Sequence, residues 1–365
     1  MPALTRRFAD SALPLILFVV VLATVLFAAG DGSLRRIVVA TVVNMIAVIG
    51  IYVFIGMTGV FSFGQLAFMA IGAYTTAVLT VPVVSKSALF DGMPEWLVQL
   101  NAPTVIAVII GALLASIVAL ALSIPMARMG EMTISLGTLA ILVAVYVVAG
   151  NWSAVTNGSK GITAIPTDTT LPVALVALVL VIIGVWVFQE SSIGLKIRAT
   201  REDAVAARAI GISVGRHRGI AFAVSAFVLG IAGGLYSHLQ GSLSPDAFYI
   251  GPTFIMVAML VVGGISTLTG AIVGTLVISV LRRVLQTVES GLDIGPLQIP
   301  GRPGITEVGL AIALLLILAL RPKGIAGGRE FSAMRLVRRF TGRRRGPDAP
   351  DAASAPEATT TGDRA

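Results

Sequence analysis

Residues 37–56 read IVVATVVNMIAVIGIYVFIG, a run of 20 residues without a charged side chain. A hydrocarbon core of about 30 Å needs about 20 helical residues to cross it, because each residue of an α-helix adds about 1.5 Å. The stretch therefore predicts a membrane-spanning helix.

Similar apolar runs recur along the chain and predict an all-α, polytopic integral membrane protein of about ten spans. The predicted spans are residues 13–29, 37–56, 66–81, 104–124, 133–150, 172–188, 218–236, 253–266, 268–287 and 304–320. We expect one transmembrane domain over 13–320, preceded by a cytoplasmic N-terminus, 1–12. A basic and then disordered cytoplasmic tail, 321–365, follows it.

The composition excludes a water-soluble fold. Of the 365 residues 56% are hydrophobic and 12% are charged, whereas soluble domains carry about 25% charged residues. The chain has no Cys, which excludes disulfides and cysteine-ligated metals. The net charge is +8, and many of the basic residues lie beside apolar spans. We therefore expect a lipid bilayer rather than nucleic acid around the protein.

Lysine and arginine predict the orientation. With ten spans and both termini in the cytoplasm, 19 of the 26 Lys and Arg residues lie inside. Two outside pairs, 35–36 and 282–283, oppose this topology locally. The first apolar run, 13–29, exceeds the about 7 to 15 residues of a signal-peptide core, so we interpret it as an uncleaved helix.

Two apolar regions, 37–81 and 253–287, are interrupted by glycine and serine. Non-helical backbone at membrane depth must be buried in protein or face water, so each break is either a re-entrant segment or part of a solute path. The alternative for Ser62 and Gln65 is interhelical hydrogen bonding. The translocation-path candidates are Gly59, Ser62, Gly64, Gln65, Gly263, Gly264 and Ser266.

Four further glycines occur as pairs spaced i and i+4, which places both members on one helix face. Small residues at this spacing let helix backbones approach closely. The predicted packing residues are Gly230, Gly234, Gly270 and Gly274.

The largest polar segment, 189–217, reads QESSIGLKIRATREDAVAARAIGISVGRH and is too polar to span. Helix-forming residues over 202–210 predict a short surface helix that ends before Gly211. Such a helix between two spans is a means by which a soluble motor moves a membrane domain. The alternative is a solvated loop whose arginines only set the topology.

Few residues of the sequence suggest a catalytic, nucleotide-binding or metal-binding site. The P-loop pattern G-x-x-x-x-G-K-[ST] is absent, because Gly158-Ser-Lys160 lacks the required spacing. The two histidines, His217 and His238, fall on opposite sides of the predicted topology. We expect no catalytic residue, no metal site and no cofactor bound by this chain. Carboxylates also avoid the middle of the spans, which argues against a proton-coupled carrier.

Several motifs together resemble one family. Residues 205–211, VAARAIG, resemble the EAA loop of bacterial ABC importer permeases, although Val205 replaces the acidic residue. The whole set occurs in the order found in branched-chain amino-acid permeases of the LivH/LivM family, and is most similar to the LivM type. These motifs are residues 56–74, 192–199, 206–212, 230–236, 244–248, 263–265 and 322–324.

This resemblance implies a permease subunit of an ABC importer rather than an enzyme, translocating branched-chain or other aliphatic amino acids by alternating access. It implies a second, LivH-like permease, two ATPase subunits that use ATP and Mg, and an extracytoplasmic solute-binding protein. Permeation of urea or short amides, or a stand-alone channel or secondary carrier, stays open. The implied ATPase-coupling residues are Glu202, Asp203, Ala206, Ala207, Arg208 and Gly211.

Overall fold

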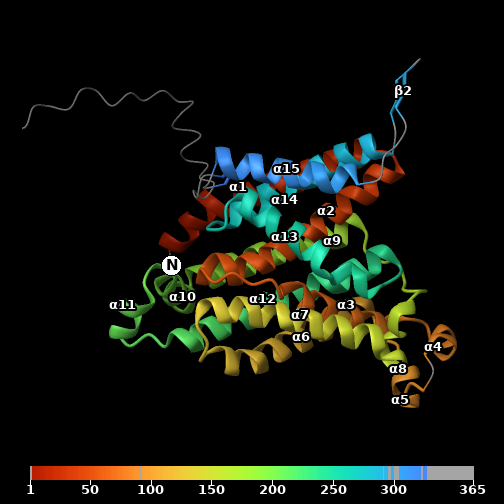
Figure 1. Ribbon diagram of the computed structural model, residues 1–365, viewed down its shortest axis with the longest axis horizontal. Coiled ribbons are helices and arrows are strands. Elements are labelled where there is room, and N and C mark those ends of the chain that lie inside the picture. The colour runs from red at the N-terminus through yellow and green to blue at the C-terminus, as the bar shows by residue number, and fades with distance from the viewer. Residues whose placement is uncertain are drawn as a thin grey trace, which may run out of the picture.

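The computed structural model describes residues 2–90, 92–290, 292–294, 297–299, 304–321 and 324–326 (Figure 1). Each predicted span contains a helix. The ten helices are α1 (Pro2–Ala29), α2 (Gly32–Ile51), α3 (Gln65–Thr80), α6 (Thr104–Met126), α7 (Glu131–Asn151), α9 (Leu171–Glu190), α12 (Val214–Gln240), α13 (Ile250–Gly263), α14 (Leu268–Glu289) and α15 (Ile305–Leu320). The predicted tail, 321–365, lies outside the described residues apart from 321 and 324–326.

Short elements connect these helices. They are the π-helix η1 (Tyr52–Gly56), α4 (Val83–Leu89), α5 (Glu95–Val98), α8 (Ser153–Thr156), η2 (Gly158–Lys160), α10 (Ser192–Glu202), α11 (Ala204–Ala209) and η3 (Pro245–Phe248). Strands β1 (Leu292–Ile294) and β2 (Leu297–Ile299) form an antiparallel hairpin in which Asp293 pairs with Gln298.

The all-α membrane class is confirmed, whereas the number of ten spans is not. Within the described ranges, eight helices are long and apolar enough to cross a bilayer, or up to nine if bent pairs count as one span. The bent pair is α3 and α4, whose axes differ by 117°. The apolar part of α15, Ile305–Ile317, is shorter than a span. The count falls short because α3 has only 16 residues and bends sharply into α4, and because the apolar part of α15 is also short.

Helices α2 and α12 form the centre of the bundle. Of the most apolar 18 residues of the span Gly32–Gly56, 78% are buried inside the protein, against 22% of those in the span Glu131–Asn151. Helix α12 packs against α2, α3 and α6. The outer helices expose leucine, isoleucine and valine, as expected of surfaces that contact lipid. Examples are Leu17, Ile106, Ile117, Leu136, Val176, Leu180 and Leu315.

Glycine permits the close packing of α12. A Cβ atom at Gly230 would lie 2.5 Å from the Cα of Ala112, and one at Gly233 would lie 2.0 Å from the carbonyl oxygen of Met69. A Cβ at Gly234 would lie 2.8 Å from a hydroxyl on α3. Helices α3 and α6 therefore contact the backbone of α12 directly.

Helices α13 and α14 form a similarly tight pair. A Cβ at Gly274 would lie 1.9 Å from the carbonyl oxygen of Met259, and one at Gly270 would lie 2.3 Å from that of Gly264. Of the four predicted packing glycines, Gly230, Gly270 and Gly274 face neighbouring backbone atoms, whereas Gly234 faces the side chains of Thr76 and Val108.

A Gly233→Ala substitution is expected to lower the free energy of unfolding by about 1–3 kcal/mol, because the added methyl overpacks the α3–α12 contact. Gly184→Ala is the matched control: it lies on α9, where a Cβ meets nothing within 4 Å, and it is expected to be neutral or slightly stabilising. Thermal unfolding of purified protein in detergent compares the two. Equal stability of both variants would contradict the close α3–α12 approach.

Candidate functional site

The two helix breaks meet at one end of the bundle. The first, residues 57–64, separates η1 from α3, and the second, residues 264–267, separates α13 from α14. A Cβ at Gly56 would lie 2.5 Å from the carbonyl oxygen of Ile265. The rings of Phe63 and Phe254 are 5.5 Å apart. Two helix breaks far apart in the sequence, together with the helix ends beside them, therefore form one junction.

Residues 324–326 complete this junction. The backbone N–H of Ile325 donates to the carbonyl of Val262 at 2.8 Å, and the N–H of Ala326 donates to that of Gly263 at 3.0 Å. Gly264, with φ +119°, has a backbone conformation that glycine adopts most easily. These bonds satisfy carbonyls that the end of α13 leaves free. Gly324, from the quoted motif 322–324, also lies against this turn, since a Cβ there would be 2.6 Å from the Cα of Gly264.

The polar segment after α9 is joined to the first break by Arg201. The Arg201 guanidinium, from the end of α10, donates to the carbonyl oxygen of Gly56 at 2.5 Å. Its Cγ lies 2.9 Å from where a Cβ of Gly59 would be, and Gly59 has φ +76°. At the other end of η1, Tyr52 donates to Gln189 Oε1 at 3.0 Å. The end of α9 and the end of α10 therefore each contact one end of η1.

The predicted surface helix over 202–210 is divided in two. Glu202 ends α10, and Asp203 adopts an extended conformation with φ −152° and ψ 108°. Its carboxylate accepts hydrogen bonds from the N–H groups of Val205 at 2.7 Å and Ala206 at 3.0 Å, and so caps a new helix, α11. These bonds lower the pKa of Asp203. The helix prediction was wrong at its start because Asp203 bonds to the backbone rather than continuing the helix.

The other predicted coupling residues lie on or just after α11. Ala207 is buried, whereas Ala206, Arg208 and Gly211 are exposed. Gly211, with φ +83°, follows the helix as expected of a terminating glycine. Arg201 was not predicted, because on sequence alone it is one of several arginines in a polar segment.

The translocation-path candidates divide into buried and exposed residues. Ser62 and Gln65 are fully buried, and Gln65 Oε1 accepts from Ser225 Oγ at 3.0 Å. Among the described residues, Ser62 Oγ and Gln65 Nε2 have no hydrogen-bond partner. A Cβ at Gly64 would lie 2.0 Å from the carbonyl oxygen of Thr138. Ser266 instead is exposed, so it does not join the buried group.

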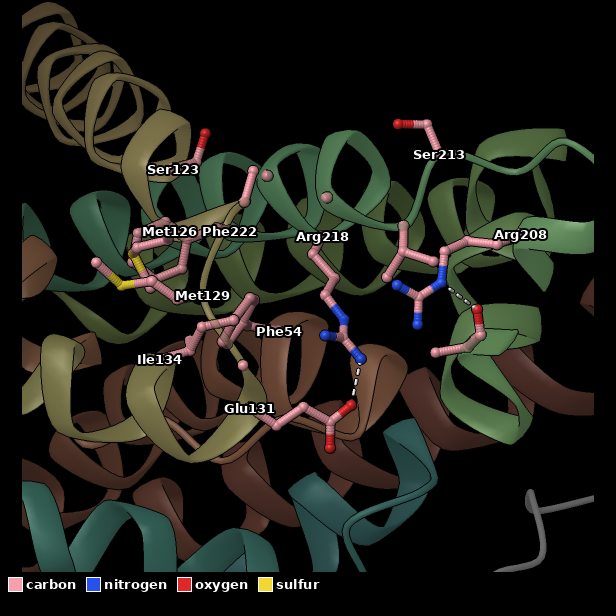
Figure 2. A pocket seen from close by; sticks show the side chains of 16 residues that line it. Phe54, Ser123, Met126, Met129, Glu131, Ile134, Arg208, Ser213, Arg218 and Phe222 are labelled. Atoms are coloured by element: carbon pink, nitrogen blue, oxygen red, sulfur yellow. Dashed lines mark hydrogen bonds and ion pairs between the residues drawn. The ribbon is translucent and has the colours of Figure 1, made fainter. Parts of the chain in front are cut away.

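A cavity of about 440 Å³ opens beside α11 (Figure 2). It lies between the turn that joins α6 to α7, the start of α12, and η1. Arg218 Nη2 lies 2.5 Å from Glu131 Oε1. The lining residues include Phe54, Met126, Met129, Glu131, Ile134, Arg208, Arg218 and Phe222. Sequence analysis did not identify this cavity, because its residues come from four separate segments.

The opposite end of the bundle holds polar groups that the sequence analysis also missed. Tyr146 donates to Asp246 Oδ1 at 3.0 Å and stacks on Tyr249, with ring centroids 4.0 Å apart. Lys86 on α4 is buried, and its Nζ donates to the carbonyl of Leu100 at 2.5 Å. Burial lowers the pKa of Lys86. The two clusters stabilise the connections that follow α3 and α12.

The apolar helices and their buried breaks define a multi-pass membrane protein. The chain belongs to the family described as the branched-chain amino acid transport system permease component, whose model matches residues 33–320. The resemblance stated from the motifs is thereby confirmed.

Three relatives illustrate the similarity. The chain is 26% identical over 280 residues to the high-affinity branched-chain amino acid transport system permease protein LivM of Escherichia coli K12, covering 67% of this chain and 62% of that protein. It is 25% identical over 320 residues to LivM of Salmonella typhimurium, covering 78% and 71%. It is 32% identical over 106 residues to the autoinducer 2 import system permease protein LsrC of an Enterobacter species, covering 29% and 30%. No solved structure matches the chain.

Asp203→Ala is expected to remove the cap of α11, so that the amides of Val205 and Ala206 exchange with deuterium several-fold faster. Asp203→Asn keeps an acceptor and is expected to retain most of the protection. The pKa of Asp203 is lowered in the folded protein, so its carboxylate is ionised and caps α11 at any pH above the ordinary pKa of about 3.9. The stabilisation by this cap is lost as the pH falls through the lower folded-state pKa.

Hydrogen–deuterium exchange followed by mass spectrometry measures this effect, with Glu202→Ala as the neighbouring control. Equal exchange in Asp203→Ala and Glu202→Ala would show that Asp203 does not hold the start of α11.

Proposed function

We propose that this chain is the membrane-spanning permease subunit of an ATP-binding-cassette importer. It translocates branched-chain or other aliphatic amino acids into the cytoplasm by alternating access, and separate ATPase subunits use ATP and Mg. Family membership over residues 33–320 supports this proposal. Two relatives are themselves named as permeases of a branched-chain amino acid transport system.

The observation that carries the proposal is the hydrogen bond from Arg201 to the carbonyl of Gly56. It joins the polar segment α10–α11 to the helix break that contacts the second break at Ile265. A displacement of α10 therefore acts directly on the junction. π-Helical turns such as η1 are frequent at functional sites, and rigid movement of packed helices about a broken region is a recognised means of alternating access.

The surface of α11 is suited to a protein partner. Val205 and Ile210 are 71% and 75% exposed, although the surrounding segment is polar. Docking of an ATPase here would bury both apolar side chains. We place this end of the bundle in the cytoplasm, together with both termini, in a bacterial plasma membrane. The remaining partners are a second, LivH-like permease, a second ATPase and an extracytoplasmic solute-binding protein.

Reconstitution tests the class of protein and its solute. Proteoliposomes that contain the chain with its permease, ATPase and binding-protein partners are expected to accumulate leucine only when ATP is supplied. The same vesicles, offered urea or acetamide, are expected to show no ATP-dependent uptake. Leucine uptake by the purified chain alone would identify a channel or secondary carrier instead, and preferential uptake of urea would reassign the solute.

Ala206→Arg and Gly211→Arg are each expected to lower ATP-dependent leucine uptake at least tenfold, because a long cation is placed on the surface proposed to contact the ATPase. Ala206→Ser, which adds little volume and no charge, is the control. Uptake and ATPase rates of the assembled transporter are measured together. Unchanged rates in both arginine variants would show that the ATPase docks elsewhere.

Arg201→Gln is expected to separate ATP hydrolysis from transport, because it removes the guanidinium that links α10 to Gly56. The assembled variant is expected to hydrolyse ATP at close to the wild-type rate while leucine uptake per ATP falls at least tenfold. Lys196→Gln, an exposed position on the same helix, is expected to retain the wild-type ratio. Proportional loss of hydrolysis and uptake in Arg201→Gln would indicate a purely structural role.

A further inference from the structure

The cavity beside α11 has one apolar wall and one charged side (Figure 2). Its volume of about 440 Å³ falls within the range of about 300–1,000 Å³ typical of small-molecule sites. The apolar wall comes from η1, α6, the turn that follows α6, α7 and α12, and its chemistry suits an aliphatic side chain. This wall consists of Phe54, Met126, Met129, Ile134 and Phe222.

The charged side carries an excess of positive charge. Both Arg208 and Arg218 line the cavity. Figure 2 shows the Arg218 side chain extending toward Glu131, whereas Arg208 Nε donates to the carbonyl of Ala204. Among the lining residues Glu131 is the one carboxylate beside these two cations, and Asp203, just before α11, lies within electrostatic range of Arg208. Within the part of the chain that the structure describes, Arg218 Nε is buried and has no hydrogen-bond partner. A second anion would satisfy both the unbalanced charge and this donor.

We propose that the cavity binds a free aliphatic amino acid from the side of the membrane that α11 faces. The inference rests on the proposed function, which places that side in the cytoplasm. Arg208 and Arg218 hold the carboxylate, the second oxygen of Glu131 accepts the ammonium group, and the apolar wall takes the side chain. The ligand is therefore the imported solute after its release.

Glu131 favours an amino acid over other amphipathic anions. Its side chain is 61% exposed and only one of its oxygens is paired with Arg218. A fatty acid or a lipid phosphate would place negative charge beside this carboxylate without offering it a cation. A zwitterion supplies both charges, so it complements all three ionised side chains.

Because of the position of the cavity, a ligand bound in it is expected to affect transport. Phe54 belongs to η1, and its ring lies 5.0 Å from that of Phe222 in an edge-to-face arrangement. Arg208 belongs to α11. A ligand in the cavity thus contacts η1 and the proposed ATPase-docking helix at once. Since a ligand shifts a conformational equilibrium toward the state that it binds more tightly, cytoplasmic amino acid should slow further import.

Calorimetry on the full chain in nanodiscs tests the binding site without requiring transport. L-Leucine is expected to bind, whereas leucinol, which lacks the carboxylate, and 4-methylpentanoate, which lacks the ammonium group, are expected to bind at least tenfold more weakly. Arg218→Gln and Glu131→Gln are each expected to raise the leucine Kd at least tenfold. Arg216→Gln, an exposed neighbour outside the cavity, is the matched control and is expected to change it less than twofold.

Arg218→Lys guards against a folding defect, because it keeps the cation and is expected to give an intermediate Kd. An equal leucine Kd in wild type and Arg218→Gln, or no leucine binding, would overturn the inference. Binding of 4-methylpentanoate as tight as that of leucine would identify a site for fatty or lipid anions and would also overturn it.

Reconstituted uptake separates this inference from the proposed function. ATP-dependent leucine uptake without leucine binding at the cavity would leave the function standing and remove the site. The opposite result is leucine binding that depends on Arg218 together with no uptake when the partners are present. It would support the binding site and contradict the proposed function.

Discussion

A lipid bilayer offers no hydrogen-bond partner to a backbone amide or carbonyl, and the arrangement of this protein depends on that constraint. An unbroken helix satisfies its own backbone. Each of the two breaks exposes groups that the protein itself must pair. Arg201 donates a hydrogen bond to the carbonyl of Gly56, and the N–H groups of residues 325 and 326 donate to the carbonyls of Val262 and Gly263. The segments that meet at the junction therefore meet because each completes the backbone bonding of another.

Close helix packing makes these pairings possible. Side chains of ordinary size on α12 would hold α3 and α6 away, because backbone atoms of those helices lie where a Cβ of Gly230 or Gly233 would stand. The same holds for α13 and α14 around Gly274. Without water to drive apolar surfaces together inside the membrane, such van der Waals contact is a main source of helix association. A compact interior brings Gln65 within hydrogen-bond distance of Ser225.

Hydropathy predicted the helices well because span length and apolarity are local properties. It also located both breaks, since glycine and serine interrupt otherwise apolar runs at Gly59 and Gly264. Their contact through Gly56 and Ile265 is a long-range feature that no local pattern carries. The sequence does not distinguish Arg201 from other basic residues of the same polar segment. Lys196, for example, occurs in a similar sequence context but is exposed. The cavity was missed for the same reason, since its charged and apolar residues are brought together only by folding.

The bonds from residues 325 and 326 to the end of α13 have a consequence for biosynthesis. The carbonyls of Val262 and Gly263 are synthesised before the residues that pair with them. Until residues 325 and 326 have been made, the α13–α14 turn lacks these two hydrogen-bond partners. The backbone bonding of the turn is completed only after α15 and the residues that follow it have been added. The order of synthesis thus makes the pairing by residues 325 and 326 a late step in assembling the second break.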